Sequence, residues 1–115
     1  MICLNGVGMF LGSDVTPTNL VERLLRNIDY VVQLVGPQHV GFGSDYMYLR
    51  GSDYGFYYKY KFAFPKGYPE PPWHFFEPEQ LPRLTEGLLN LRYSENDVRG
   101  VLGENFLRLA KQVWK

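Results

Sequence analysis

The chain has 115 residues, of which 45% are hydrophobic, so it is long enough for one small domain with a packed core. A formal net charge of zero and a pI of about 6.7 give it no bulk attraction for nucleic acid or for an anionic membrane surface. A single cysteine argues against a disulfide framework, and the absence of a basic leader argues against a secretory signal. No apolar run approaches the roughly 18 residues of a membrane span, which argues against a transmembrane protein. We therefore expect a cytoplasmic protein with no membrane and no nucleic-acid partner.

The first predicted element is a strand over residues 2–5 (ICLN), apolar on both faces as in a covered parallel sheet. The glycine-rich stretch 6–12 suits a tight loop. Thr16 followed by Pro17 then predicts the start of a helix, with Thr16 as its N-cap.

That helix is predicted to run to Val35, because apolar residues recur at helical spacing from Leu20 onward and Gly36-Pro37 ends the pattern. Residues 39–45 form the second predicted strand. Strand, helix and strand in this order predict a βαβ crossover with parallel strands.

Residues 46–77 differ from the rest of the chain, since they hold most of its tyrosine, phenylalanine and tryptophan residues and show no helical period. Connections of this length are usually lids or binding loops, and we expect a lid here. The alternation of aromatic residues with lysines over 58–64 is compatible with a short hairpin strand. The same YYKYKF pattern occurs in single-strand nucleic-acid binders, but it is short and the net charge is zero.

Three helices are predicted over the C-terminal residues 78–115. The first covers 78–92, the second starts at a capping box formed by Ser94 and Asp97 and runs to Leu102, and the third covers 106–114. The whole chain is thus predicted as one α/β domain. Because two parallel strands alone leave both sheet edges unpaired, we expect either the tail of a larger α/β protein or a chain that self-associates.

Asp45 is the candidate for chemistry, since it ends the second predicted strand and functional groups of parallel α/β proteins gather at the carboxyl ends of strands. Gly41 and Gly43 share its face, as a crowded barrel interior would require. The alternative, an aspartate that caps the following turn, stays open at this point. The two histidines, His39 and His74, lie far from Asp45 or in the lid, and with one cysteine they make no metal-ligand cluster.

Three stretches resemble the C-terminal part of the membrane dipeptidase (renal dipeptidase) family, and the bacterial branch is the more similar. They are NGVGMFLG at 5–12, NIDYVVQLVGPQHVGFGSDY at 27–46, and PEQLPRLTEGLLNLRYSENDVRGVLGENFLRLAKQVW at 78–114. The resemblance implies a metal-dependent hydrolase (β/α)8 TIM barrel, of which this α/β chain supplies the last two parallel strands plus helices. It also implies zinc-dependent hydrolysis of dipeptides.

The resemblance further implies roles for individual residues. Asp45 matches the acid/base next to a binuclear zinc site, while Phe10 and Asn5 are the nearest matches to substrate-binding positions. Asn105 and Gly103 match a terminal motif with a structural role. The family's zinc ligands come from earlier strands and are absent from this sequence, so the 115-residue chain alone is predicted to be inactive.

Two other interpretations remain. The chain is either a non-catalytic α/β interaction module that closes its sheet edges against another copy, or part of a different amidohydrolase-like barrel in which Asp45 ligates the metal directly. Replacing a carboxylate that only moves protons leaves the metal content of the protein unchanged, whereas replacing one that binds the metal lowers it.

Overall fold

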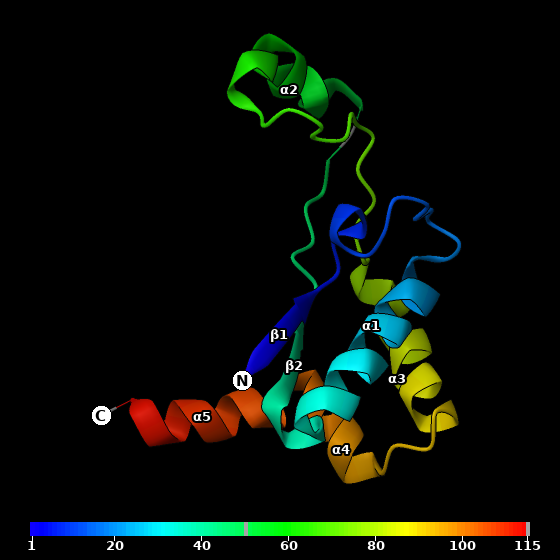
Figure 1. The fold of residues 1–115 in the computed structure, drawn as a ribbon, viewed down its shortest axis with the longest axis vertical. Coiled ribbons are helices and arrows are strands. Elements are labelled where there is room, and N and C mark those ends of the chain that lie inside the picture. Colours follow the sequence, from blue (N-terminus) through cyan, green and yellow to red (C-terminus); the bar gives the residue numbers. More distant parts are fainter. Residues whose placement is uncertain (50, 115) are drawn as a thin grey trace.

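The computed structural model describes residues 1–49 and 51–114, and it is a mixed helix-and-sheet structure (Figure 1). Strands β1 (Ile2–Asn5) and β2 (Val40–Gly43) pair in parallel, with Ile2 opposite Val40 and Asn5 opposite Gly43. Helix α1 (Leu20–Val35) connects them. The predicted βαβ unit and its parallel pairing are confirmed, and so is the coarse α/β class.

Helix α1 has the amphipathic pattern seen in the sequence, and Gly36 ends it with a φ of 85°, a left-handed conformation that favours glycine. The predicted start at Thr16 is wrong, because the helix begins at Leu20. Thr16 and Asn19 form a separate turn, in which the Thr16 N–H donates to Asn19 Oδ1 at 2.8 Å. Asn19 N–H in turn donates to Thr16 Oγ1 at 3.4 Å, so Thr16 makes the reciprocal bonds of a cap, but they close a turn that precedes α1.

Strand β2 is shorter than the predicted 39–45. His39 belongs to a 3-10 turn, the strand ends at Gly43, and Asp45 lies beyond it with a φ of 47°. β2 ends early because the residue after β1, Gly6, changes its hydrogen-bonding partner from β2 to a later segment. Gly6 N–H donates to Gly43 O at 3.2 Å, but Gly6 O accepts from Phe76 N–H at 2.7 Å. The later segment therefore takes up the hydrogen bonding that a longer β2 would need.

This crossing point is crowded. A Cβ added to Gly6 would lie 2.8 Å from Ser44 O and closer still to the Cβ of Phe76. The segment that ends with Phe76 also bonds one residue pair further along, since Gly8 N–H donates to His74 O at 2.8 Å. A glycine at position 6 is therefore what allows three segments to meet at the carboxyl ends of the strands.

Three helices follow in the C-terminal part, as predicted: α3 (Leu81–Asn90), α4 (Glu95–Arg99) and α5 (Asn105–Val113). The capping box at the start of α4 is confirmed, because Asp97 N–H donates to Ser94 Oγ at 3.2 Å and Ser94 N–H donates to Asp97 Oδ2 at 3.3 Å. Helix α4 ends earlier than the predicted Leu102, where a wide π-type turn begins.

Asn105, at the start of α5, is the one buried polar residue among those described, with 7% of its surface exposed. Its Nδ2 donates to Pro37 O and to Val40 O, both at 2.8 Å. Because both acceptors lie at the entrance to β2, this side chain fastens α5 to the sheet. That is a structural role of the kind predicted for Asn105.

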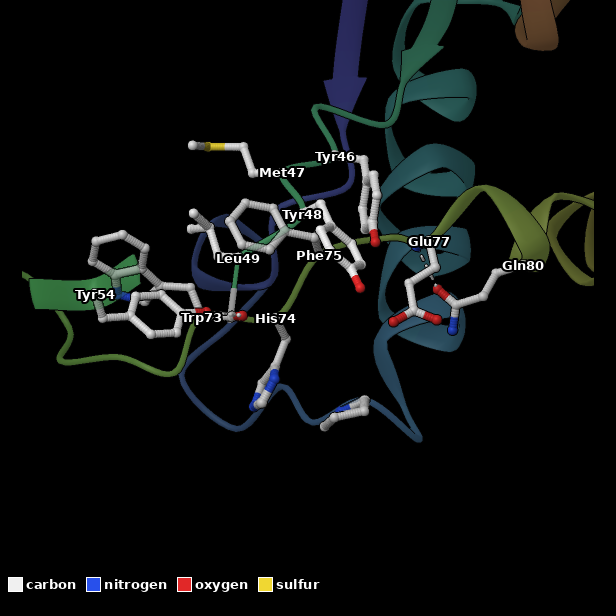
Figure 2. Close-up of a pocket in the computed structure, with 11 residues that line it drawn as sticks. Tyr46, Met47, Tyr48, Leu49, Tyr54, Trp73, His74, Phe75, Glu77 and Gln80 are labelled. Atoms are coloured by element: carbon white, nitrogen blue, oxygen red, sulfur yellow. Dashed lines mark hydrogen bonds between the residues drawn. The ribbon is translucent and has the colours of Figure 1, made fainter. Parts of the chain in front are cut away.

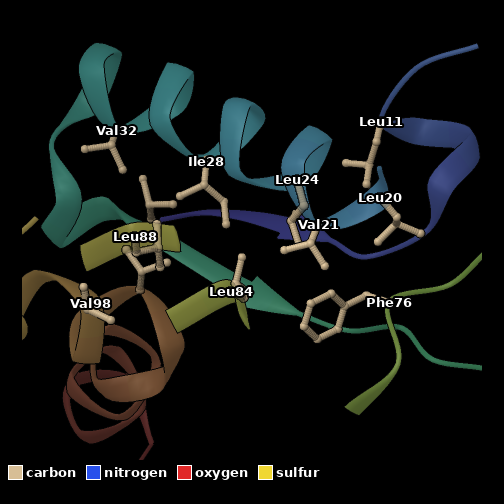
Figure 3. Packing of buried hydrophobic residues seen from close by; sticks show 12 residues of the cluster. Leu11, Leu20, Val21, Leu24, Ile28, Val32, Phe76, Leu84, Leu88 and Val98 are labelled. Atoms are coloured by element: carbon tan, nitrogen blue, oxygen red, sulfur yellow. The ribbon is translucent and has the colours of Figure 1, made fainter. Parts of the chain in front are cut away.

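The main core lies between α1 and the C-terminal helices (Figure 3). Leu24 and Ile28 of α1, Val40 of β2 and Leu84 of α3 are each fully buried. The opposite face of the sheet is less covered, since Cys3, which alternates with Ile2 and Leu4 along β1, is exposed. Of the described helices, none combines the length and the apolar run that a bilayer crossing requires.

Residues 46–77, here called the aromatic segment, extend away from the strands (Figure 1). They contain helix α2 (Gly55–Lys59) and a 3-10 turn at Lys61–Ala63, so the hairpin strand over 58–64 is wrong. The side chains gather around Tyr57, which is 1% exposed and has the ring of Phe64 at 4.9 Å. The aromatic residues here pack around one ring, that of Tyr57, instead of alternating along a pleated strand.

Candidate functional site

Asp45 lies where the chain leaves β2 on the carboxyl side of the two parallel strands. Its side chain is exposed, and its φ of 47° falls in the left-handed region, where aspartate is more tolerated than most residues. Within the described part of the chain, no hydrogen bond or ion pair holds its carboxylate, so it does not cap a turn there. The structure leaves this carboxylate accessible to an external group.

Asn5 ends β1 at the same edge of the sheet, but its side chain serves the fold. Val7 N–H donates to Asn5 Oδ1 at 3.1 Å, which closes a short turn directly after the strand. The predicted contact of Asn5 with substrate stays a prediction, and its amide nitrogen has no hydrogen-bond partner among the described residues.

Phe10 lies in the loop after β1 and is 65% exposed. It lines an open pocket of about 490 Å³ between its own loop and the end of the aromatic segment, where Trp73 and His74 form the opposite wall. Neither Asp45 nor Asn5 lines this pocket. The three predicted site residues thus share one side of the sheet without meeting in one cavity.

A second pocket, of about 360 Å³, begins one residue after Asp45 (Figure 2). Tyr46 and Tyr48 come from the chain leaving β2, whereas Phe75 and Glu77 come from the end of the aromatic segment, just before α3. In Figure 2 the Tyr46 ring is drawn next to Glu77, and the Phe75 ring lies farther from it. We call this cavity the tyrosine pocket.

The tyrosine pocket is electronegative. Partial burial and the carboxylates of Glu77 and Glu79 raise the pKa of Tyr46 above its ordinary value, because a tyrosinate there would face two negative charges. Among the described residues that line the pocket there is no lysine and no arginine. On the charges of the described residues alone, this pocket favours a cation over an anion.

The described residues do not assemble a metal centre. No group of three or more His, Cys, Asp or Glu side chains lies together among them. His74 lines both pockets, but His39 is exposed in a turn next to the amino end of β2. Any metal at this edge of the sheet would need ligands from outside the described residues.

The sequence pointed to residues 46–77 as a lid but not to the tyrosine pocket. The signal within it was the pair Tyr46 and Tyr48, which immediately follows Asp45. Glu77 could not be joined to that pair, because their proximity depends on the segment 74–76 returning to the end of β1.

No model of a known protein family matches this chain, and no solved structure matches it. Evidence on function therefore comes from the residues and the geometry of the chain itself.

Proposed function

We propose that this chain is the C-terminal part of a zinc-dependent dipeptidase built on a (β/α)8 barrel, with Asp45 as its acid/base. The observation that carries the proposal is the position of Asp45, which follows a parallel strand at its carboxyl end with an exposed carboxylate that no described group engages. Barrel enzymes place their reacting side chains at this edge. The resemblance of residues 27–46 to the dipeptidase family supports the same assignment.

The incomplete sheet also supports membership of a larger barrel. Two strands form the whole sheet among the described residues, and isolated two-stranded sheets are marginal in water. Ile2 at the start of β1 is 45% exposed, and the neighbouring Cys3 is exposed as well. Further strands of a barrel would pair both free edges and cover these side chains.

In the proposed reaction the Asp45 carboxylate accepts a proton from the attacking water and passes it to the nitrogen of the leaving amine as the peptide bond breaks. The geometry needed is a substrate nitrogen within hydrogen-bond reach, and the exposed carboxylate leaves room for it. The described residues offer no ligand set for zinc, so we derive no step through the metal. The 115-residue chain by itself is expected to be inactive.

The test begins with the DNA upstream of the Met1 codon. An in-frame coding region that supplies the rest of a barrel would provide the full-length enzyme, in which Asp45→Asn should lower kcat by about 10²- to 10⁴-fold with the zinc content unchanged. Glu95→Gln is the matched control, because it removes an exposed carboxylate from the first turn of α4 and should leave the rate unchanged. A wild-type rate for Asp45→Asn would refute the assignment, and loss of zinc would favour an amidohydrolase-like barrel in which Asp45 binds metal.

A second candidate function is that of a non-catalytic α/β module that self-associates. The free edges of the two-stranded sheet favour it, together with the exposed Phe106 and Leu107 on α5. Sedimentation equilibrium of the 115-residue chain distinguishes the two. A defined oligomer that unfolds cooperatively and binds no zinc would support the module, whereas a monomer at all concentrations would contradict it.

A further inference from the structure

We propose that the tyrosine pocket binds an organic ammonium ion, a positively charged amine attached to a small apolar group. The site consists of the aromatic rings of Tyr46, Tyr48 and Phe75 and the carboxylate of Glu77. This inference goes beyond the proposed function, because it requires neither metal nor peptide hydrolysis and is tested on the 115-residue chain itself.

The aromatic rings form the apolar part of the site. Tyr46 and Tyr48 lie two residues apart on the chain that leaves β2, and both line the pocket together with Phe75 (Figure 2). The backbone of Phe75 pairs with that of Val7 in an antiparallel bridge, which fixes the position of Phe75. Aromatic faces attract ammonium groups through their quadrupoles, and several rings around one cavity are the usual form of such sites.

The carboxylate of Glu77 supplies the charge. It precedes α3, where its backbone N–H donates to Gln80 Oε1 at 3.0 Å, so the start of the helix fixes the position of the residue. No lysine or arginine among the described residues forms an ion pair with Glu77. A carboxylate that no described lysine or arginine pairs with, lying beside aromatic rings, is matched by a ligand that carries a positive charge.

The electrostatics of the cavity agree with this ligand class. The same two glutamates that raise the pKa of Tyr46 would stabilise a cation at that ring. They would also repel a carboxylate or a phosphate. The pocket therefore selects by charge as well as by shape, which is how specificity against ligands of similar size arises.

The test is a titration of the chain with 2-phenylethylammonium, its neutral analogue 2-phenylethanol and the anion 3-phenylpropionate. Amide shifts in a ¹H–¹⁵N NMR spectrum over residues 46–49 and 73–77 report the binding site. We expect the ammonium ion to bind with a Kd on the order of millimolar, about tenfold tighter than the alcohol, and the anion not to bind.

Two variants separate the contributions, and one serves as a matched control. Glu77→Gln should weaken binding of the ammonium ion by about tenfold and leave binding of the alcohol unchanged. Glu79→Gln removes the same charge from a residue that does not line the pocket, and should weaken binding by less than about threefold. Tyr46→Leu keeps the apolar volume but removes a ring, and should weaken the ammonium ion more than the alcohol. Thermal unfolding by circular dichroism confirms that each variant is folded.

Several results would overturn the proposal. Equal affinity for alcohol and ammonium would mean a merely apolar pocket, and equal losses in Glu77→Gln and Glu79→Gln would mean only a long-range charge effect. Absence of shifts in the wild-type chain would mean no site. Because none of these readouts involves hydrolysis, failure here leaves the dipeptidase proposal standing, and failure of that proposal leaves this one intact.

Discussion

Replacing Asn105 by alanine should destabilise the protein more than any other single loss of a polar side chain. The amide nitrogen of Asn105 has two N–H groups, and the structure matches them to two carbonyl oxygens, those of Pro37 and Val40, each at 2.8 Å. The residue is 7% exposed, and Val40 is fully buried. Water therefore cannot readily replace the lost donors at the Val40 carbonyl.

The expected magnitude follows from these contacts. A buried acceptor left unsatisfied costs about 1–3 kcal/mol, so two acceptors of unequal burial give a loss of about 2–4 kcal/mol for Asn105→Ala. Urea unfolding followed by circular dichroism measures it, at unchanged m-value. Asn96→Ala, at an exposed position of α4, is the control and should change stability by less than about 0.5 kcal/mol. A loss below about 1 kcal/mol for Asn105→Ala would refute the reasoning, because the fastening of α5 to β2 would then contribute little beyond water.

Three further predictions concern packing and pH. Gly6→Ala should lower the free energy of unfolding by about 1–3 kcal/mol, since the new methyl group collides with the backbone of Ser44 and the side chain of Phe76. The control is Gly43→Ala, whose methyl group meets no atom within 4 Å. Urea unfolding compares the two variants, and equal losses of stability would contradict the crowding at Gly6. Tyr57→Ala should abolish hydrogen-exchange protection in the aromatic segment while the main core keeps its own, and Phe62→Ala, 86% exposed, should change neither. Burial and the hydrogen bond to the Asp29 carboxylate on α1 raise the pKa of Tyr93, so the folded state holds that proton more tightly than the unfolded state. The resulting stabilisation is complete below about pH 10, the unfolded pKa, and is lost as the pH rises through the higher folded pKa. Tyr93→Phe should flatten this decline of the free energy of unfolding with pH.

The elements that the sequence predicted well are those whose cause is local. Helix α1 follows from apolar residues three and four apart and from Gly36, and the start of α4 follows from Ser94 and Asp97, which bond to each other across one turn. The parallel pairing of β1 and β2 follows from the helix between them, because a crossover connection of this length returns the chain in the same direction. Asp45 follows β2 but lies outside it, since the strand ends at Gly43, and its role stays a prediction.

The ends of the elements and the composition of the pockets had another cause. β2 stops at Gly43 because residues 74–76 bond to the end of β1, and nothing near β2 in sequence signals that contact. Residues 58–64 form helical turns instead of a strand, and the rings of Tyr58 and Phe64 pack on Tyr57, which also contacts Trp73.

The tyrosine pocket shows which features follow from the local sequence and which depend on long-range contacts. The sequence alone determined which residue types were present after β2, the aromatic rings and the carboxylate of Asp45. Only the tertiary structure decided that Glu77, some thirty residues later, would stand beside Tyr46 and raise its pKa. The physical reason is range: backbone geometry and capping act within about one turn of chain, whereas the charge and shape of a cavity are set by segments that meet through long-range packing.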